Sequence, residues 1–307
     1  QDMLRNLGAF DVAMTVLSLV SSIPDSSEEI ANNTREILRM CCVFLTWFIR
    51  GNKANQELAH EQLDFFIDNL SEDILAASVM AEIFRAHPRL IKQFPTHLIS
   101  TFVEYTVGHG LDPQHLEVME ALTWQPAGST ESNVSLQYLI LQELTMPQRA
   151  DPVLFTCSEP ESEQYVERRK LMAEAQKRLM EDGSADGHGE LAGLMMNCDT
   201  LHMAPSLAYH VKLLDVLAGT AVGRLNITTV EAKLQNLYKP KDLLVALLDS
   251  SVTLDVLVPL ANFFYHAVIE VEIVVPDLCK SPDLWNYLDV CVSHFGEAKK
   301  QLERMQE

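Results

Sequence analysis

The residues best suited to metal chemistry lie in an acidic segment near the middle of the sequence. Asp182, Ser184, Asp186 and Gly187 match positions one, three, five and six of an EF-hand calcium loop, where short oxygen-bearing side chains bind the ion and glycine allows a sharp turn. Position twelve must supply a bidentate carboxylate, but Gly193 occupies it. The segment therefore fits a flexible acidic linker better than a calcium loop, and calcium binding there stays an open alternative.

Basic residues are too few and too well neutralised to form a phosphate site. The chain has 23 Lys and Arg against 43 Asp and Glu, a formal net charge of −20. The only compact cationic stretch, Arg168 to Lys170 with Lys177 and Arg178, alternates with glutamates at helical spacing, so we interpret it as a solvated helix face. Nucleic-acid binding and direct contact with an anionic membrane need clustered cations, and we expect neither.

Recognisable catalytic and metal-binding patterns are missing from the sequence. It contains ten histidines but no HExxH pair, no GxSxG elbow, no GxxxxGK[ST] loop and no GxGxxG after a strand. His60, His210 and His266 lie in helical runs among apolar residues, which favours packed or partly exposed histidines over ligands. We therefore predict a protein that is not an enzyme, with no catalytic, cofactor-binding or metal-ligating residue and no cofactor; its ligand-binding residues are unknown.

Cysteine usage predicts a reducing compartment, and hydropathy predicts no membrane-spanning segment. Six cysteines occur without a CxxC pair, and Cys41 and Cys42 lie in an apolar helical run, as reduced core thiols do. Three glycosylation sequons, which begin at Asn32, Asn133 and Asn226, point weakly the other way. No apolar run approaches the roughly 18–20 residues that cross a bilayer. Because the chain begins at Gln1 rather than Met, we expect a segment of a longer polypeptide.

Most of the sequence shows the spacing of apolar residues that is typical of α-helices. Apolar residues recur at four-three-four spacing in two stretches, Leu207, Val211, Leu214 and Ala218, and Val256, Leu260, Phe263 and Ala267. Helix starts are predicted at the capping box Ser26 to Glu29 and at two prolines that follow a capping residue, Asp112-Pro113 and Ser281-Pro282.

A pattern that occurs twice in the sequence suggests stacked helical hairpins. In both Leu38 to Leu70 and Leu207 to Leu248, an apolar helix is followed by a glycine, Gly51 or Gly223, and then by an asparagine and a second helix. Two unrelated hairpins with similar turns would look the same, but the pattern favours a repeat. The predicted fold is all-α, an armadillo/HEAT-like right-handed α-solenoid of helical hairpins. We place an N-terminal half at 1–182, an acidic Gly-containing linker at 183–204 and a C-terminal half at 205–307.

Two stretches resemble the helical homology (RIH) domain shared by inositol 1,4,5-trisphosphate and ryanodine receptors. Met40 to Asp68 is similar to that domain's helix, Gly-Asn-x-x-Asn-Gln turn and second helix, with Gly51, Asn52, Asn55 and Gln56 in step. Ala208 to Leu248 resembles the family's Tyr-His-x-x-Leu-x-x-Leu-Leu-Ala helix, its glycine turn and the next hairpin. Between about 125 and 203 the similarity is poor.

The resemblance implies a non-catalytic scaffold or regulatory segment of an intracellular ligand-gated calcium-release channel. It would lie on the cytosolic face of the endoplasmic reticulum or a related calcium store, and its partners would be other domains and subunits of a tetrameric parent. The ligand pocket of that family is rich in arginine and lysine, and this chain has no such cluster, so a central block is expected. The alternative is a free-standing armadillo-like adaptor that binds a peptide on a concave face, through residues such as Asn52, Asn55 and Asn226.

Overall fold

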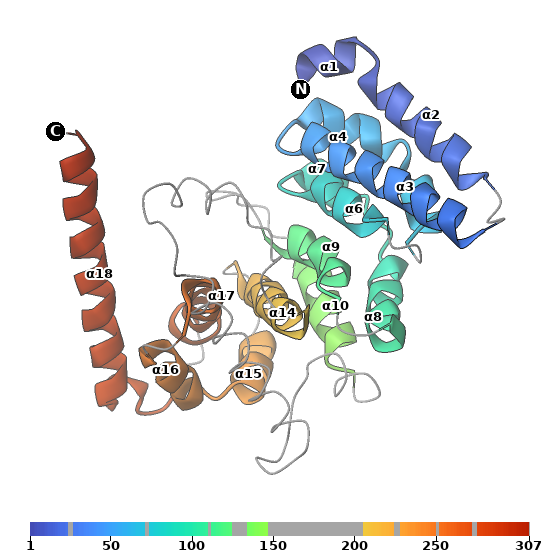
Figure 1. Ribbon diagram of the computed structural model, residues 1–307. Helices are drawn as coiled ribbons and strands as arrows, with labels where there is room; N and C mark the ends of the chain where they lie inside the picture. Colours follow the sequence, from blue (N-terminus) through green and yellow to red (C-terminus); the bar gives the residue numbers. More distant parts are fainter. Residues whose placement is uncertain are drawn as a thin grey trace. The chain divides into compact units, whose positions relative to one another are not determined.

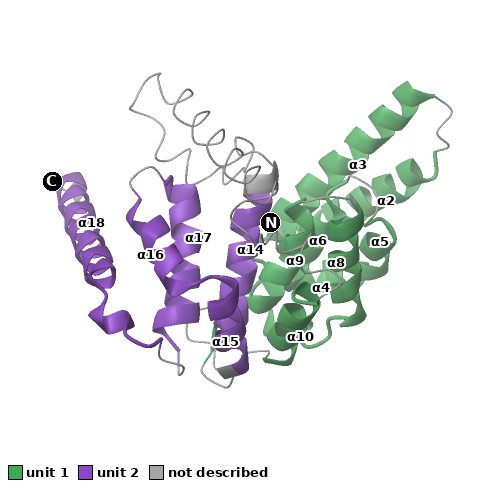
Figure 2. Ribbon diagram, turned by 90° about the horizontal axis from the view of Figure 1, so that it is seen from below, with its two compact units in different colours: residues 1–155, 222–224 green, residues 156–221, 225–307 purple. Residues whose placement is uncertain are grey.

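The computed structural model of the chain is helical throughout the residues that it describes (Figure 1). Those residues are 1–23, 27–70, 74–109, 112–124, 134–146, 205–223, 228–249, 252–271 and 275–306. No strand occurs among them, which confirms the all-α prediction. The chain forms two compact units, one of residues 1–155 with 222–224 and one of residues 156–221 with 225–307 (Figure 2).

The described part of the first unit consists of ten helices. They are α1 (Asp2–Asn6), α2 (Ala9–Ser21), α3 (Glu28–Ile49), α4 (Lys53–His60), α5 (Leu63–Asp68), α6 (Ala76–Phe84), α7 (Pro88–Ile91), α8 (His97–His109), α9 (Gln114–Thr123) and α10 (Val134–Leu144). Their contacts follow a succession in which α2 packs on α3, α3 on α6 and α6 on α9, while α8, α9 and α10 pack on one another. Figures 1 and 2 both show α2 and α3 side by side.

Helix α6 is the core of the first unit. Every residue from Ala76 to Phe84 except Ser78 is buried, as expected of a helix that contacts α3, α4, α5, α7 and α9. Its aromatic end packs edge to face against two other rings, with the Phe84 centroid 5.0 Å from that of Phe94 and 5.9 Å from that of His60. Glu82 is the one charged residue among these buried residues of α6. A buried carboxylate needs partners, so Glu82 needs them from neighbouring helices.

The turn between α3 and α4 follows the predicted glycine and asparagine pattern. Gly51 has a φ of +70°, a left-handed conformation that favours glycine at a helix C-terminus. Asn52 then caps α4, because its side chain accepts a hydrogen bond from the backbone N–H of Asn55 at 3.2 Å. Only part of the second occurrence of this pattern lies in the described residues. Gly223, which follows α14, has a φ of +107°, and Asn226 lies outside the described residues.

The described part of the second unit is built around a pair of apolar helices. It contains α14 (Pro205–Ala221), α15 (Thr228–Leu237), α16 (Pro240–Leu248), α17 (Leu254–Phe264), a π-helical segment (Tyr265–Ile269), a 3-10 turn (Leu278–Lys280) and α18 (Pro282–Gln306). Helix α14 packs on α17, and α16 packs on α17 and α18. All four residues of the predicted stripe from Val256 to Ala267 are buried, as are Val211, Leu214 and Ala218.

One of the predicted helix starts is confirmed, because Pro282 is the first residue of α18. Helix α9 begins at Gln114, one residue after the predicted Pro113, and the Asp112 carboxylate accepts a hydrogen bond from the N–H of Gln114 at 2.9 Å. The cap of α3 is Ser27, one residue later than the predicted Ser26, because the Ser27 side chain accepts from the N–H of Ile30. No helix in the described ranges is both long and apolar enough to cross a membrane. The predicted linker 183–204 lies outside these ranges.

Candidate functional site

Three residues of the Gly51 to Gln56 turn, Asn52, Asn55 and Gln56, join the ends of several helices of the first unit. Asn55 is fully buried, and its Nδ2 donates to the carbonyl oxygen of Phe48 at 2.7 Å. Phe48 lies in the last turn of α3, whose carbonyl groups have no partner within the helix. The Oδ1 atom of Asn55 accepts a hydrogen bond from Arg5 of α1 at 2.7 Å. This one side chain therefore connects α1, α3 and α4.

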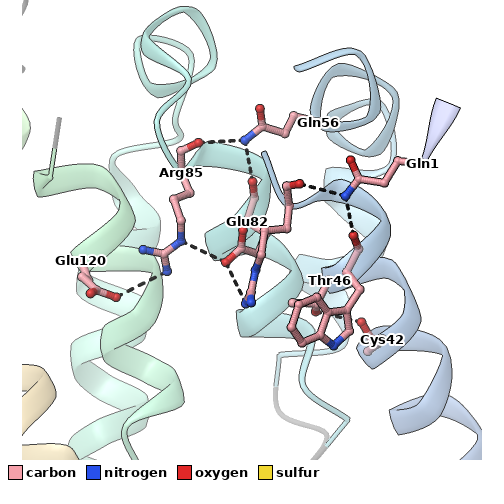
Figure 3. Close-up of polar contacts among 9 residues, drawn as sticks. Gln1, Cys42, Thr46, Gln56, Glu82, Arg85 and Glu120 are labelled. Atoms are coloured by element: carbon pink, nitrogen blue, oxygen red, sulfur yellow. Dashed lines mark hydrogen bonds and ion pairs between the residues drawn. The ribbon is translucent and has the colours of Figure 1, made fainter. Parts of the chain in front are cut away.

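Gln56 connects α4 to α6 through hydrogen bonds of its side chain. The residue is buried, and its Nε2 donates to the carbonyl oxygens of Glu82 and Arg85, both at 2.8 Å. Figure 3 shows this amide group reaching from α4 to the end of α6. Two carbonyl groups at a helix C-terminus are thus satisfied by one side chain from another helix, and water is not needed there.

Glu82 lies between Arg50 and Arg85 in the same region, and Figure 3 shows its contact with Arg85. Its Oε1 atom is 3.0 Å from Nε of Arg85 and 3.4 Å from Nη2 of Arg50. Arg85 also reaches Oε2 of Glu120 on α9 at 3.4 Å. Burial alone would lower the pKa of Arg85, but the carboxylates of Glu120 and Glu82 raise it above its usual value. The ion pairs therefore link α3, α6 and α9.

The N-terminus of the chain is tied to the same turn. Nε2 of Gln1 donates to the carbonyl oxygens of Trp47 at 2.8 Å and Arg50 at 2.9 Å. Asp2 accepts a hydrogen bond from Asn52 at 2.9 Å and pairs with Arg5 at 3.1 Å, and these two contacts lower the pKa of the Asp2 carboxyl.

We call these ten residues the turn network: Gln1, Asp2, Arg5, Arg50, Asn52, Asn55, Gln56, Glu82, Arg85 and Glu120. They come from α1, α3, α4, α6 and α9, together with the residues at the ends of these helices. The network has no hydroxyl, thiol or imidazole group to act as a nucleophile or proton shuttle, and its buried amides are engaged with backbone groups. What it can do is hold five helices in a fixed arrangement, because each buried polar group depends on a partner from another helix.

A buried histidine lies beside the network. His87 accepts a hydrogen bond from the N–H of Leu90 through its Nδ1, which caps the short helix α7, and its Nε2 is 3.8 Å from Oε1 of Glu57. Burial lowers the pKa of His87. Glu57 is itself paired with Arg89 at 3.2 Å. The neutral imidazole is therefore the form that fits this site.

The other residues considered for chemistry are dispersed in the described structure. His60 contacts Phe84, His210 is buried and lies against Tyr238, and His266 is 3.0 Å from Glu270. No group of three potential metal ligands occurs in the described ranges. Cys41, Cys42, Cys279 and Cys291 are free thiols. The acidic segment 182–190, the basic stretch 168–178, Cys157 and Cys198 lie outside the described residues.

Sequence reasoning found the turn but missed its partners. The resemblance to the RIH turn points to Asn52, Asn55 and Gln56, but not to Glu82, Arg85 and Glu120. A signal for Glu82 was present, since a lone carboxylate in an otherwise apolar helical run needs a buried partner. Nothing in the sequence identified that partner as Arg50, which is 32 residues away.

The sequence matches a known protein family. The RIH domain model of the ryanodine and inositol trisphosphate receptors matches residues 1–156, about half of the chain. This range contains the whole turn network and the first of the two stretches that carried the resemblance. The second stretch, Ala208 to Leu248, lies outside the match and stays a prediction.

Proposed function

The chain belongs to the RIH domain family of ryanodine and inositol trisphosphate receptors, and we propose that it is a non-catalytic scaffold or regulatory segment of an intracellular ligand-gated calcium-release channel. It acts on the cytosolic face of the endoplasmic reticulum or a related calcium store. Its partners are other domains and subunits of the parent channel, which the family relationship suggests is a tetramer. The turn network is the observation that carries this proposal, because it suits a block that transmits force or position without performing chemistry.

The network gives the first unit the stiffness that a scaffold needs. Asn55 and Gln56 are buried amides whose hydrogen bonds end on the backbone of α3 and α6. Sliding one helix past another would leave these donors and carbonyl groups unpaired, at roughly 1–3 kcal/mol for each group. A displacement of α1 or α4 is therefore more readily passed to α6 and α9 than absorbed between them.

Exposed apolar side chains on the first three helices support contact with other parts of a channel. Leu7, Val12, Leu19 and Met40 are each more than 60% exposed, and Trp47 is 54% exposed. A helical array that ends in solvent normally presents a polar outer face on its terminal repeat. Helices α1 to α3 do not, so we propose that a neighbouring helical domain of the parent protein covers them.

We further propose that the helices form an armadillo/HEAT-like right-handed solenoid. The succession of contacts from α2 to α3, α6 and α9 supports this, since each layer packs mainly on the next, as in a one-dimensional stack. The halves 1–182 and 205–307, with the linker at 183–204, remain our proposal for the domain organisation.

The alternative of a free-standing adaptor has less support. It requires asparagines on the inner helices that are available to a peptide backbone. Asn55 is fully buried and engaged with Phe48 and Arg5, and Asn52 caps α4 and bonds to Asp2. Asn226 lies outside the described residues. Two of the three candidate asparagines are thus already used within the fold.

Protease protection of the native protein tests the proposal. An antibody raised against the 307-residue chain is used on sealed endoplasmic reticulum vesicles, with and without added protease. We expect a polypeptide much larger than 34.5 kDa that stays with the membranes after a salt wash, and whose epitope is lost when protease is added outside the vesicles. A lumenal chaperone should remain intact in the same samples. A freely soluble polypeptide of the size of this chain, or an epitope protected by sealed membranes, would contradict the proposal.

A further inference from the structure

The second half of α3 has one exposed face, which combines arginines with apolar side chains. Between residues 38 and 50 the only exposed residues are Arg39, Met40, Val43, Trp47 and Arg50. Because a helix turns by about 100° per residue, these five side chains lie within an arc of about 100°. We call them the α3 face. Met40 is 64% exposed and Trp47 is 54% exposed, so the described chain leaves the apolar part of this face in contact with solvent.

Arg50 is held in position at one end of this face. Its guanidinium carbon lies 4.4 Å from the centre of the Trp47 ring, and its Nη2 atom is 3.4 Å from Oε1 of Glu82. The Arg50 side chain is still 48% exposed, and a guanidinium group has five N–H donors, so donors remain for a second carboxylate. These two contacts orient the guanidinium group in advance, which lowers the entropic cost of binding a partner.

Acidic side chains are scarce along the α3 face. The sequence has no Asp or Glu from residue 37 to residue 56. Glu36 lies on the same side of α3 and marks the N-terminal limit of the face. Helix α2, which packs on α3, contains one charged residue, Asp11. Within the second half of α3, the charges on this side are therefore those of Arg39 and Arg50.

The carboxylates at the C-terminal end of the face already have partners. Asp2 pairs with Arg5 at 3.1 Å. Glu82 is buried, and its Oε1 atom is shared between Arg85 and Arg50. The α3 face is thus a cationic surface in a chain whose formal net charge is −20.

We propose that the α3 face docks an acidic amphipathic helix from another segment of the parent protein. The apolar stripe of that helix covers Met40, Val43 and Trp47, and its carboxylates pair with Arg39 and Arg50. A helix fits because Met40, Val43, Trp47 and Arg50 recur at spacings of three, four and three, the pattern that a second helix matches. The inference rests on the proposed function, in which another part of the channel covers α1 to α3, and it names the chemistry of that part.

The charge of the whole chain makes this recognition selective. A basic helix is attracted to a chain of net charge −20 as a whole, but the two arginines repel it at the α3 face. An acidic helix is repelled by the chain as a whole and attracted at this face. Charge therefore selects both the kind of partner and the place where it docks.

Fluorescence anisotropy with the 307-residue chain tests the proposal. The probes are two labelled helical peptides of about 18 residues, or about five turns, which share one stripe of leucines. Glutamates flank the stripe in one peptide, and lysines flank it in the other. We expect the acidic peptide to bind at least about tenfold more tightly than the basic one. Unspecific attraction to a chain of net charge −20 would give the opposite preference.

Substitutions on α3 locate the binding site. Trp47→Ala should weaken binding of the acidic peptide at least about tenfold, because aromatic anchors dominate interfaces. Arg39→Glu should weaken it about threefold or more. Glu36→Lys extends the cationic stripe by one turn and should strengthen binding, a gain that misfolding cannot produce. Arg304→Glu makes the same charge change on α18 and should have no effect. Circular dichroism establishes that each variant keeps its helix content.

Several results would overturn the proposal. They are binding of neither peptide, binding of the basic peptide at least as tight as that of the acidic one, unchanged binding in Trp47→Ala, and equal weakening by Arg39→Glu and Arg304→Glu. The last result would mean that net charge alone matters. These measurements use no membranes, so they are independent of the protease-protection experiment. Their failure would refute the acidic partner and leave the channel assignment standing.

Discussion

At the scale of single residues, Gln56 decides how α4 is joined to α6. Its Nε2 donates to two carbonyl oxygens, so Gln56→Met should leave both unpaired and lower the free energy of unfolding of the first unit by about 1–3 kcal/mol for each carbonyl group. Gln56→Glu should cost more at neutral pH, because a carboxylate oxygen would then face the two carbonyl oxygens. Urea unfolding followed by circular dichroism measures both changes.

The exposed Gln93 provides the matched control for this substitution. Gln93→Glu makes the same chemical change in contact with solvent and should alter stability by less than about 0.5 kcal/mol. Equal effects of Gln56→Glu and Gln93→Glu would mean that the amide of Gln56 does not hold the two helices together.

His87 makes stability depend on pH. Because burial lowers its pKa below the unfolded value of 6.5, the unfolded chain binds more protons, so this contribution is present above about pH 6.5 and is lost as the pH falls through the folded-state pKa. Glu57 opposes this shift, while Lys53 and Arg89 reinforce it. Burial lowers the pKa of His60 as well, so part of the loss should persist in any single variant.

The expected result is a smaller loss of stability on acidification in His87→Asn than in the wild type. Asparagine can still accept the hydrogen bond from the N–H of Leu90 but does not titrate in this range. Thermal melts at pH 7.5 and 5.5 compare the two proteins, with the exposed His97→Asn as the control. If His87→Asn loses as much stability between pH 7.5 and 5.5 as the wild type does, His87 is not responsible for the loss.

Residue types alone predicted part of this site. Asparagine after a left-handed glycine is a strong local signal for a helix start, so Asn52 could be assigned as a cap before its partners were known. The roles of Gln56 and Glu82 depend on which helices pack together, and their partners lie 26 to 32 residues away. Local patterns contain no information about such separations, because they arise from the tertiary arrangement of apolar faces.

At the scale of elements, the turn between α3 and α4 depends on the conformation of Gly51. A Cβ atom at this position would meet nothing within 4 Å, so space does not limit substitution, but φ is +70°. Gly51→Ala should therefore cost about 1–2 kcal/mol through backbone strain alone, and Gly51→Asn should cost less, because asparagine tolerates this region.

Gly108 is the matched control for Gly51. It lies inside α8, its added Cβ would also meet nothing within 4 Å, and its φ is not positive. Gly108→Ala should thus stabilise the chain by roughly 0.5–1 kcal/mol. Opposite signs for the two glycine-to-alanine substitutions, measured by urea unfolding, are the expected result, and a shared sign would refute the backbone explanation.

Helices were more predictable than their ends. The apolar residues from Val256 to Ala267 face the core, as predicted. A helix has 3.6 residues per turn, so apolar residues at this period lie on one face, and that face is the one that is buried. The start of α3 was displaced by one residue because Ser26 and Ser27 are chemically equivalent capping residues, and only backbone geometry selects between them. The π-helical segment at Tyr265–Ile269 had no local signal; Gln235 donates to the carbonyl oxygen of Ala267 within it, at 3.0 Å.

At the scale of the whole molecule, the division into two units predicts where damage will be confined. Glu82→Ala removes the shared partner of Arg50 and Arg85, and loss of one side of a buried ion pair is strongly destabilising. If the units unfold independently, amide hydrogen exchange should accelerate in α4, α6 and α9 and stay unchanged in α14 and α17.

A substitution in the second unit supplies the reciprocal experiment. Phe263 of α17 is fully buried, and α17 packs on α14, so Phe263→Ala should cost about 3–5 kcal/mol and accelerate exchange in α14 and α17 while sparing α6 and α9. Acceleration in both units by either variant would mean that they unfold as one. A scaffold of the proposed kind needs stiffness within each unit, from contacts such as those of Glu82, and effects confined to one unit would show that the two units have separate cores. The pair of exchange experiments measures both properties in the same chain.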